Sequence, residues 1–293
     1  MRALSWNLYH GRDFPPDPAL FTLRSRLFRI TERNETHVQV NRLLRDEFAG
    51  WIAGRDWEVA LLQEAPPLWF RAIGARARAS GVRVLTSRNV VPPLQRLAAN
   101  LNPDLIASWE GGSNQLFVRA PGQILEHRRL TLAWRPEQRR MVWARIRLAS
   151  GATVCVANLH ASAGAPERAA LEVLAAAAAA VRWSGGDPLV FGGDLNLRPA
   201  RSPATFAELR ERDGLGDPTA SDAIDHILAR GLEVVERPVR LAAEERELPD
   251  EGGRRLRLSD HAPVLARFEG EIVPPSGNES DHNRRDQGGA AHG

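Results

Sequence analysis

Short apolar segments that end at turn-forming residues dominate the hydrophobic pattern of residues 1–268. Segments of about four to eight apolar residues between such turns are typical of β-strands. The pattern predicts strands at residues 2–6, 59–62, 82–86, 115–118, 124–132, 141–148, 153–159, 189–192, 224–228, 232–241 and 262–268. Residues 141–148 alternate, with Val142, Ala144, Ile146 and Leu148 on one side, which predicts a strand that buries only that face.

Two segments repeat their apolar residues with the period of an α-helix. Residues 37–53 space them about 3.6 residues apart, as an amphipathic helix does. These side chains are Val40, Leu43, Leu44, Phe48 and Ile52. Residues 166–182 begin with proline and glutamate and contain a run of six alanines, which predicts a stable helix. Helices between strands predict a layered α/β fold.

The composition is that of a globular protein. Of 293 residues, 43% are hydrophobic and 26% charged, which excludes a chain disordered throughout, a collagen and a disulfide scaffold. The one cysteine, Cys155, can form no internal disulfide. No apolar run reaches the roughly 20 residues of a membrane span, and the N-terminus lacks a signal-peptide pattern. We therefore expect a cytoplasmic monomer without a membrane span.

The composition changes near residue 270. Residues 270–293 are rich in proline, glycine and polar residues, and they contain few apolar side chains that could join a core. We therefore predict one domain over residues 1–269 and a disordered tail over residues 270–293.

The isoelectric point of about 10.1 overstates the basic character of the chain. All 39 basic residues are arginines, and there is a single tyrosine, so few groups titrate between histidine and arginine. A net charge of only +3 therefore suffices to raise the isoelectric point. This modest charge gives little support by itself for binding to nucleic acid.

Polar residues that can carry chemistry stand at the ends of the predicted strands. They are Asn7, Glu64, His160, Asp194, Asn196, Asp225, Asp260 and His261. Loops at the strand ends of a layered fold converge on one rim, where sites are built. Carboxylate and amide oxygens suit a hard cation such as Mg²⁺ or Mn²⁺, and an aspartate with a histidine can orient an attacking water.

The motifs around these residues resemble, in order and spacing, those of the endonuclease/exonuclease/phosphatase superfamily. They are Ser5-Trp6-Asn7, Gln63-Glu64, Gly193-Asp194-Leu195-Asn196, Ile224-Asp225-His226-Ile227 and Ser259-Asp260-His261. That superfamily includes abasic-site endonucleases, pancreatic-type deoxyribonucleases, sphingomyelinases and inositol-polyphosphate 5-phosphatases. The resemblance covers residues 2–268 and implies a four-layered α/β sandwich, with two mixed sheets packed face to face and helices outside.

The resemblance also implies the roles of a metal site and its attacking water. Glu64 is similar to the principal ligand of the divalent cation, Mg²⁺ or Mn²⁺, and Asn7 and Asp260 complete or support that site. Asp194 is similar to the residue that orients or deprotonates the attacking water. Asn196 resembles its partner, which holds the water or a phosphoryl oxygen.

Two histidines complete the implied site. His261 would contact a phosphoryl oxygen, with Asp225 fixing its tautomer and raising its pKa. His160 resembles the histidine of the deoxyribonuclease and sphingomyelinase branches that contacts phosphate or protonates the leaving group. The abasic-site endonucleases carry different residues there. Phosphoryl transfer depends mainly on positioning and charge neutralisation, which such a site supplies.

Two classes of function stay open at this point. A metal-dependent phosphoesterase is favoured over a non-catalytic nucleic-acid-binding module, since a chain that had lost catalysis should have lost one of these motif residues. The resemblance implies that the substrate is a phosphate ester, either DNA or RNA cleaved by a nuclease, or a small molecule or lipid headgroup. Arginine clusters that could form a basic face are Arg24, Arg26, Arg29 and Arg33; Arg71, Arg76, Arg78 and Arg83; and Arg135, Arg139 and Arg140.

Several residues beside the motifs have both a functional and a structural interpretation. Those that could contact the substrate are Tyr9, His10, Asn114, Arg198 and Trp109. Asn158 is expected to form hydrogen bonds behind the site rather than to bind a ligand.

Overall fold

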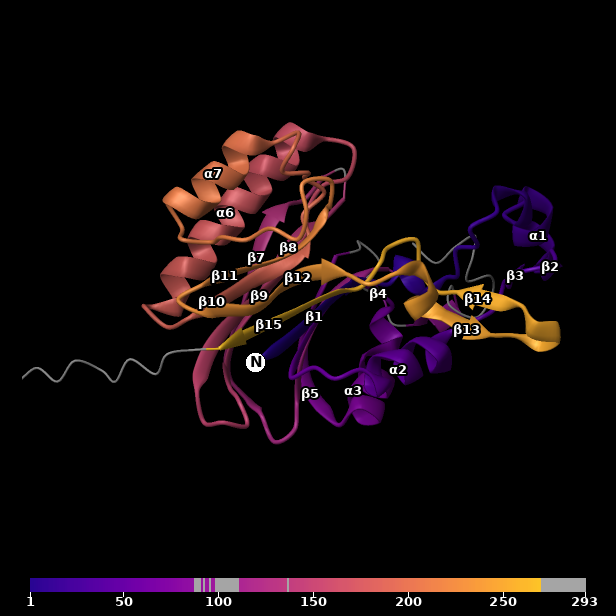
Figure 1. Ribbon diagram of the computed structural model, residues 1–293, viewed down its shortest axis with the longest axis horizontal. Coiled ribbons are helices and arrows are strands. Elements are labelled where there is room, and N and C mark those ends of the chain that lie inside the picture. The colour runs from indigo at the N-terminus through magenta and orange to yellow at the C-terminus, as the bar shows by residue number, and fades with distance from the viewer. Residues whose placement is uncertain (87–90, 92, 95, 98–110, 136, 270–293) are drawn as a thin grey trace, which may run out of the picture.

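Two large β-sheets form the framework of the molecule (Figure 1). The computed structural model describes residues 1–86, 91, 93–94, 96–97, 111–135 and 137–269. The first sheet contains, in spatial order, β12 (Glu233–Arg240), β15 (Val264–Glu269), β1 (Arg2–Asn7), β4 (Val59–Ala65), β6 (Ser113–Arg119) and β5 (Ala79–Leu85). The second contains β11 (Asp225–Arg230), β10 (Leu189–Asp194), β9 (Thr153–His160), β8 (Arg139–Arg147) and β7 (Gln123–Ala133).

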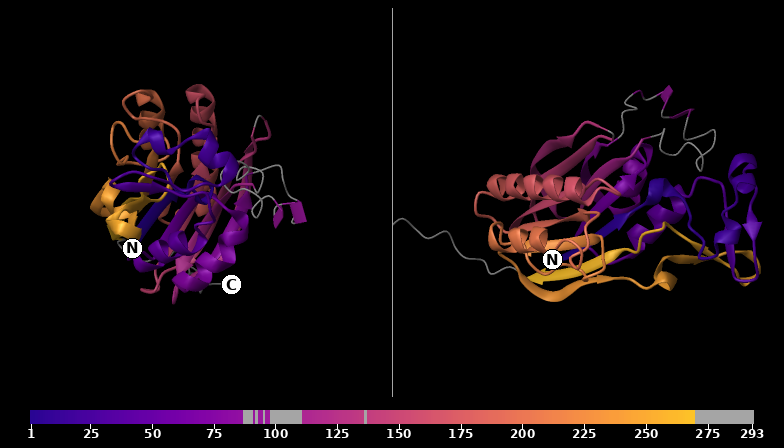
Figure 2. Two further views of the ribbon diagram at one scale, coloured as in Figure 1. Left: turned by 90° about the vertical axis from the view of Figure 1, so that its right-hand side faces the viewer. Right: turned by 90° about the horizontal axis from the view of Figure 1, so that it is seen from above.

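Both large sheets are mixed. β1 pairs parallel with β4 in the first sheet, and β9 pairs parallel with β10 in the second, while their other neighbours are antiparallel. A small third sheet consists of β13 (Glu247–Pro249), β14 (Arg255–Arg257), β3 (His37–Gln39) and β2 (Glu32–Arg33). It lies with α1 (Leu23–Phe28) at one end of the molecule (Figure 2).

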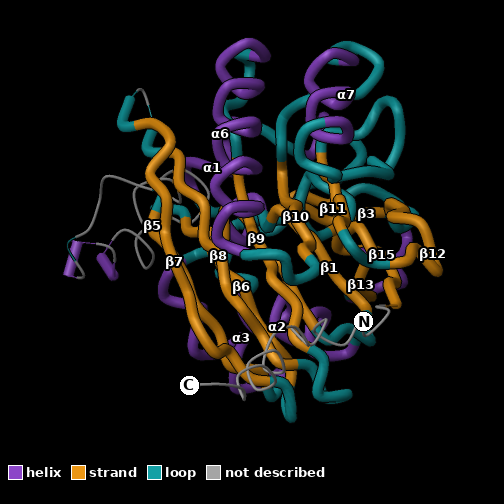
Figure 3. Tube along the Cα trace, turned by 90° about the vertical axis from the view of Figure 1, so that its left-hand side faces the viewer, coloured by secondary structure: helices purple, strands orange, loops and turns teal. Residues whose placement is uncertain are grey.

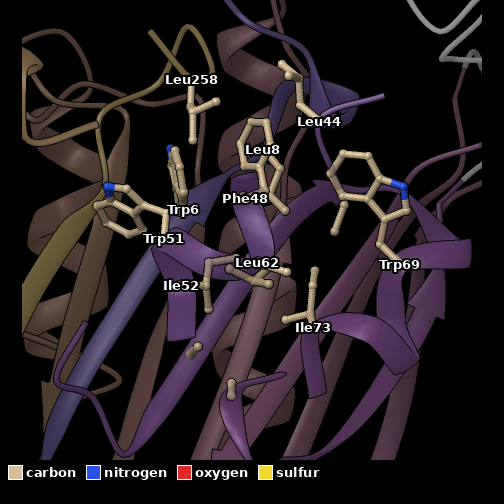
Figure 4. Packing of buried hydrophobic residues seen from close by; sticks show 14 of the residues in the cluster. Trp6, Leu8, Leu44, Phe48, Trp51, Ile52, Leu62, Trp69, Ile73 and Leu258 are labelled. Carbon is tan, nitrogen blue, oxygen red and sulfur yellow. The ribbon is translucent and has the colours of Figure 1, made fainter. Parts of the chain in front are cut away.

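The two large sheets bury apolar side chains against each other, among them Leu61 and Leu116 from the first sheet and Val142 and Val156 from the second. Helices α2 (Arg45–Gly54) and α3 (Phe70–Ala77) pack on the first sheet, where Trp6 and other large side chains are buried (Figure 4). Helices α6 (Pro166–Ser184) and α7 (Pro203–Glu211) lie along the second sheet (Figure 3). The protein thus has a mixed α/β fold with few helices.

Short 3₁₀ turns connect several of these elements. They are η1 (Tyr9–Gly11), η2 (Pro18–Leu20), η3 (Pro67–Trp69), η4 (Ala243–Arg246) and η5 (Glu251–Gly253). Within the described residues, no helix is long and apolar enough to cross a membrane.

Each predicted strand overlaps an observed strand, and the helix predicted at residues 166–182 is α6. The helix predicted at residues 37–53 is wrong in its first half, because residues 37–39 form β3 and α2 begins only at Arg45. β3 pairs with β14, a segment more than two hundred residues further along the chain, and Val38 and Val40 still pack in the core. A local pattern of apolar residues could not reveal this distant pairing.

The strand at residues 141–148 was expected to bury one face, and β8 buries both. Val142 and Ile146 face the first sheet, while Met141 and Trp143 pack under α6. An alternating pattern is typical of a strand with one face in water, but α6 covers the outer face of β8 and excludes water from it. The tail at residues 270–293 and Trp109 lie outside the described residues.

Candidate active site

The ends of four strands bring the candidate residues to one place. Asn7 ends β1, and Glu64 lies one residue before the end of the parallel neighbour β4. In the second sheet His160 ends β9, and the register places Asp194, the last residue of β10, beside both His160 and Asp225. Parallel strands end at the same edge of a sheet, and the packing of the two sheets against each other brings these two edges together at one rim.

Asp194 lies at the centre of this group and is almost completely buried. Its Oδ2 accepts a hydrogen bond from Nδ2 of Asn7 at 3.0 Å. The same oxygen lies 3.5 Å from Nε2 of His160 and 3.8 Å from Nε2 of His261. Burial and the negative charge of Asp225 raise the pKa of Asp194 to about 7. A carboxylate with this pKa can accept and release a proton near neutrality.

His261 and Asp225 form a close pair. Nδ1 of His261 lies 2.8 Å from Oδ2 of Asp225. Burial by itself lowers the pKa of His261, but the charge and hydrogen bond of Asp225, with the charges of Asp194 and Asp260, raise it to about 10. Trp6 donates a hydrogen bond from Nε1 to the backbone carbonyl of His261 at 2.9 Å. His261 is therefore an imidazolium fixed in orientation.

Glu64 lies at a β-bulge in β4 and has a left-handed backbone with φ of 46°. Its Oε2 is 3.2 Å from Nε2 of His10, and its Oε1 is 3.7 Å from Nε2 of His160. Burial raises the pKa of Glu64, but the two histidines and a hydrogen bond from Asn7 outweigh it and lower the pKa to about 2. Glu64 is consequently ionised throughout the physiological range.

His160 is buried and contacts a buried arginine. Nη1 of Arg139 lies 3.2 Å from Nδ1 of His160, and Nη2 of Arg139 forms an ion pair with Glu137 at 2.6 Å. Burial lowers the pKa of His160, the charge of Glu64 opposes this, and the positive charge of Arg139 lowers it further, so the pKa falls to about 3. The two site histidines thus have opposite charge states.

Left-handed backbone conformations are concentrated at the site. The residues there with positive φ are Tyr9, His10, Glu64, Asn196 and Ser259. Such conformations cost non-glycine residues free energy and cluster at functional sites. Gly193 has φ of 128°, and a Cβ at this position would lie 2.0 Å from the carbonyl oxygen of Leu159. Glycine before Asp194 is therefore required for β10 to approach β9.

The loop after His160 is held by buried hydrogen bonds. Glu172 of α6 accepts one from the backbone N–H of Ser162 and one from its hydroxyl, each at 2.7 Å. Asn196 donates from Nδ2 to the carbonyl of Ala161 at 3.0 Å, and its backbone N–H donates to Oδ1 of Asp194 at 3.0 Å. The β9 and β10 sides of the site are tied together through these contacts.

Ser259 joins the Asp260–His261 segment to the end of β1. Its Oγ donates to the carbonyl of Asn7 at 2.7 Å and accepts from the backbone N–H of His261 at 3.1 Å. Burial and the negative charge of Glu64 raise the pKa of the Asp260 carboxyl. Asp260 therefore lies close enough to Glu64 for their charges to interact, although the two residues are far apart in the sequence.

Asn158 forms hydrogen bonds behind the site, as predicted. Its Nδ2 donates to the carbonyls of Leu62 and Gln115 at 2.9 and 2.7 Å, and its Oδ1 accepts from Nε2 of Gln63 at 2.8 Å. These contacts link the second sheet to β4 and β6 of the first. The buried polar network fixes the distance between the strand ends that carry the site.

A cavity of about 300 Å³ opens beside His261. It is lined by Arg198, Asp222, Ile224, Asp225, Arg240, Arg246, Asp260, His261 and Ala262. Arg240 is bound by both oxygens of Asp222 at 3.0 Å, whereas Arg246 is buried and its pKa is lowered first by burial and then by Arg257. Guanidinium groups in such a cavity match the charge of a phosphate.

Arg246 and the contact of Arg139 with His160 were not predicted. Arg246 belongs to η4, which lies between β12 and the three-residue strand β13 and carries no motif. In the sequence Arg139 stands only in a cluster of arginines, although its position at the start of a buried strand is a signal for a role near the site. Both reach the site through tertiary packing.

Four of the residues that the sequence suggested as substrate contacts lie within the described part of the chain. His10 contacts Glu64, and Arg198 lines the cavity. The ring of Tyr9 lies 3.7 Å from the guanidinium carbon of Arg12. Asn114 is buried and donates to the carbonyl of Arg140 at 2.7 Å, while its Oδ1 lacks a hydrogen-bond partner among the described residues.

The donor atoms of the site suit a hard divalent cation. Asp194, Asp225 and His261 bring a carboxylate oxygen or ring nitrogen each within 4.8 Å of one another, but the charged ring of His261 donates hydrogen bonds and leaves the two carboxylates as the cation ligands of this group. Oδ1 of Asp225 is buried without a hydrogen-bond partner in the described part of the chain. Of the residues predicted as ligands, Glu64 offers an ionised carboxylate, whereas Asn7 directs its Nδ2 toward Asp194 and its Oδ1 accepts from the backbone N–H of Tyr9 at 3.0 Å.

Comparison with known proteins supports the resemblance on which the roles of these site residues rest. The model of the endonuclease/exonuclease/phosphatase family matches residues 4–261. The chain belongs to this family. All three activities in the family name cleave phosphate ester bonds, so this family member is a phosphoester hydrolase. No match to the sequence was found among curated proteins.

Solved structures of the endonuclease/exonuclease/phosphatase family share this fold. A family member from Bacteroides vulgatus is 18% identical, with a TM-score of 0.59 over 92% of this chain and 98% of that one. A mannosyl-6-phosphatase from Bacteroides thetaiotaomicron is 14% identical, with a TM-score of 0.59 over 92% and 99% of the two chains. The catalytic domain of human nocturnin is 16% identical, with a TM-score of 0.57 over 92% and 94%.

Proposed function

We propose that this hydrolase cleaves a phosphodiester by in-line attack of a water molecule, with Mg²⁺ or Mn²⁺ as its cofactor. The observation that carries the proposal is the position of Asp194. A buried carboxylate with a pKa near neutrality lies between the neutral His160 and the cationic His261. Such a carboxylate can accept a proton from water while its neighbours hold the phosphoryl group.

Each residue then has a defined task. Asp194 orients the attacking water and takes its proton, and Asn196 holds the water or a phosphoryl oxygen. His261, kept charged by Asp225, donates a hydrogen bond to a phosphoryl oxygen, where negative charge grows in the transition state. His160 donates a hydrogen bond from Nε2 as a neutral group. Its low pKa disfavours a role in protonating the leaving group.

Asn7, Glu64 and Asp260 are the proposed ligands of the cation. When bound, a divalent cation would neutralise charge on the phosphoryl oxygens. The low pKa of Glu64 keeps its carboxylate available as a ligand. The four-layered sandwich of the family forms part of this proposal, and the packing of helices on the outer faces of both large sheets supports it.

A phosphatase acting on a small phosphate ester is the second candidate. The cavity of about 300 Å³ beside His261, with Arg198 and Arg246, has the size of a small ligand site. A structural relative acts as a mannosyl-6-phosphatase. A non-catalytic nucleic-acid-binding module is disfavoured, because every motif residue is present and the charged groups have complementary roles.

Hydrolysis of bis(4-nitrophenyl) phosphate and of 4-nitrophenyl phosphate, each with Mg²⁺, Mn²⁺ or excess chelator, tests this proposal. We expect metal-dependent turnover of the diester that Asp194→Asn abolishes. Asp56→Asn, which changes an exposed aspartate before the opposite end of β4, should retain activity. Full activity in chelator or in Asp194→Asn would refute the mechanism, and turnover of the monoester alone would favour the phosphatase.

Binding of the Asp194→Asn variant to nucleic acid distinguishes a nuclease from a small-ester enzyme. Contacts with several phosphates release counterions, so log K should fall with log salt concentration by about 0.9 for each contact on duplex DNA. A small-ester enzyme touches one or two phosphates and should show a correspondingly shallow slope. Light scattering of the same sample tests the expectation that the protein is a monomer.

A further inference from the structure

A second cavity, of about 250 Å³, lies where β5 of the first sheet meets β7 and β8 of the second. Three arginines line it, Arg83, Arg129 and Arg140, together with Val84 and Leu85. Figure 3 shows the edges of the two sheets that carry β5 and β7 beside each other. Its volume is below that of most pockets for whole ligands, so it suits one charged group of a larger molecule.

The cavity opens at the same end of the sheets as the active site. Arg140 directly follows Arg139, the residue that contacts His160. Leu85 pairs with Ser113, and Ser113 pairs with Ala65, the residue after Glu64. The wall formed by β8 is therefore close to His160, and the wall formed by β5 is at the edge of the sheet where Glu64 lies.

The three arginines of the cavity have no carboxylate partner among the residues that the structure describes. Arg83 donates to the carbonyl of Pro67, and Arg140 donates from Nε to Oγ1 of Thr131 at 3.1 Å. By contrast, Arg128 of the same strand as Arg129 pairs with Glu126 at 2.6 Å. Burial, followed by the positive charges of Arg71 and Arg129, lowers the pKa of Arg83.

An arginine has five N–H donors, so these contacts leave donors available to a ligand. Guanidinium groups that repel one another without a nearby acid are stabilised by an anion, and phosphate oxygens match their planar donor pattern. We propose that Arg83, Arg129 and Arg140 bind a second phosphate group of the substrate, next to the phosphate that is cleaved.

This inference rests on the proposed phosphoesterase function and narrows its substrates to esters with at least two phosphate groups. Two kinds of substrate would supply such a group, and in both a second phosphate lies next to the bond that is cleaved. It can come from the next phosphate of a nucleotide chain or from a small bisphosphate, and the experiment separates these sources.

The first measurement does not depend on catalysis. Nε resonances of ¹⁵N-labelled arginines are followed while inorganic phosphate is added to the full chain in chelator. We expect the resonances of Arg83 and Arg140 to move together, and that of Arg128 to stay in place. If the cavity resonances do not move, or if they move no more than that of Arg128, the proposal is wrong.

The second measurement compares kcat/KM for thymidine 5′-(4-nitrophenyl phosphate) and for its 3′-phosphorylated form. The second phosphate should raise kcat/KM by about tenfold or more, since hydrogen bonds between charged groups are strong. The double variant Arg129→Gln/Arg140→Gln should remove this ratio, whereas Arg128→Gln should keep it. An unchanged ratio in the double variant would overturn the proposal.

Glucose 6-phosphate and glucose 1,6-bisphosphate form a parallel pair without a nucleotide. A preference for the second phosphate in the thymidine pair alone identifies a nucleotide chain, and a preference in the sugar pair identifies a small bisphosphate. Preference in neither pair, with measurable turnover, contradicts the subsite. Absence of any turnover would refute the proposed function, and the phosphate titration would still decide the subsite.

Discussion

Arg139 donates a hydrogen bond from Nη1 to Nδ1 of His160 across 3.2 Å. Because a guanidinium has no acceptor, Nδ1 must supply the lone pair, and the proton of the neutral ring resides on Nε2. That Nε2 lies 3.5 Å from Asp194 and 3.7 Å from Glu64. Arg139 thereby fixes the tautomer of His160 and presents a hydrogen-bond donor to the centre of the site.

Replacement of Arg139 by methionine should release this tautomer. We expect the ¹⁵N shifts of His160 to change from a protonated Nε2 to a mixture of tautomers, and hydrolysis to fall by about tenfold or more. Glu137→Gln is the matched control, because it removes the ion pair of Arg139 but leaves its hydrogen bond to His160. Unchanged ¹⁵N shifts in Arg139→Met would show that Arg139 does not fix the ring.

The pair of Asp225 and His261 should set the alkaline limit of activity. The pKa of His261 is raised from 6.5 to about 10, so the stabilisation from its charge is complete below about pH 6.5 and is lost as pH rises through about 10. In Asp225→Asn the basic limb of the kcat profile should move down by one or more pH units, on the order of 1.4 kcal/mol per unit. A basic limb that stays in place would exclude Asp225 from this role.

Glu64→Gln tests the metal site and its electrostatics. The pKa of Glu64 is lowered from 4.5 to about 2, so its stabilising contribution is present above about pH 4.5 and is lost as pH falls through about 2. At neutral pH His160 is uncharged and this part of the stabilisation is absent, so in chelator the variant should lose no more than about 1 kcal/mol of unfolding free energy in urea titrations. Calorimetric titration should show weaker Mg²⁺ binding. Unaltered Mg²⁺ affinity would exclude Glu64 as a ligand.

Glu172→Ala should loosen the loop behind His160. The substitution leaves the buried N–H and hydroxyl of Ser162 without their acceptor, at a cost of about 2–3 kcal/mol of unfolding free energy. Arg168→Ala, which changes an exposed side chain one turn earlier in α6, should change stability by only about 0.5 kcal/mol. Equal effects of the two substitutions in urea denaturation would contradict this account.

The strand ends that carry the site could be predicted from the sequence. Asn7, Glu64, His160 and Asp194 each follow a buried apolar segment, and the carboxyl ends of parallel strands in one sheet meet at one edge. The helix α6 was equally clear, because its proline start and alanine run act locally and the helix ends at Gly185, which has a left-handed conformation. In these cases the signal lies within one element.

Other features depend on contacts between segments far apart in the chain, and only the tertiary structure decided them. Residues 37–39 form a strand because β14 offers a pairing edge, which outweighs a local helical pattern. The charge states of His160 and His261 differ because burial and then the charge of Arg139 lower the pKa of His160, whereas the contact with Asp225 raises that of His261 against burial. The sequence determined which side chains stand at the strand ends, but electrostatic fields depend on distance, so their protonation follows from packing that no local pattern contains.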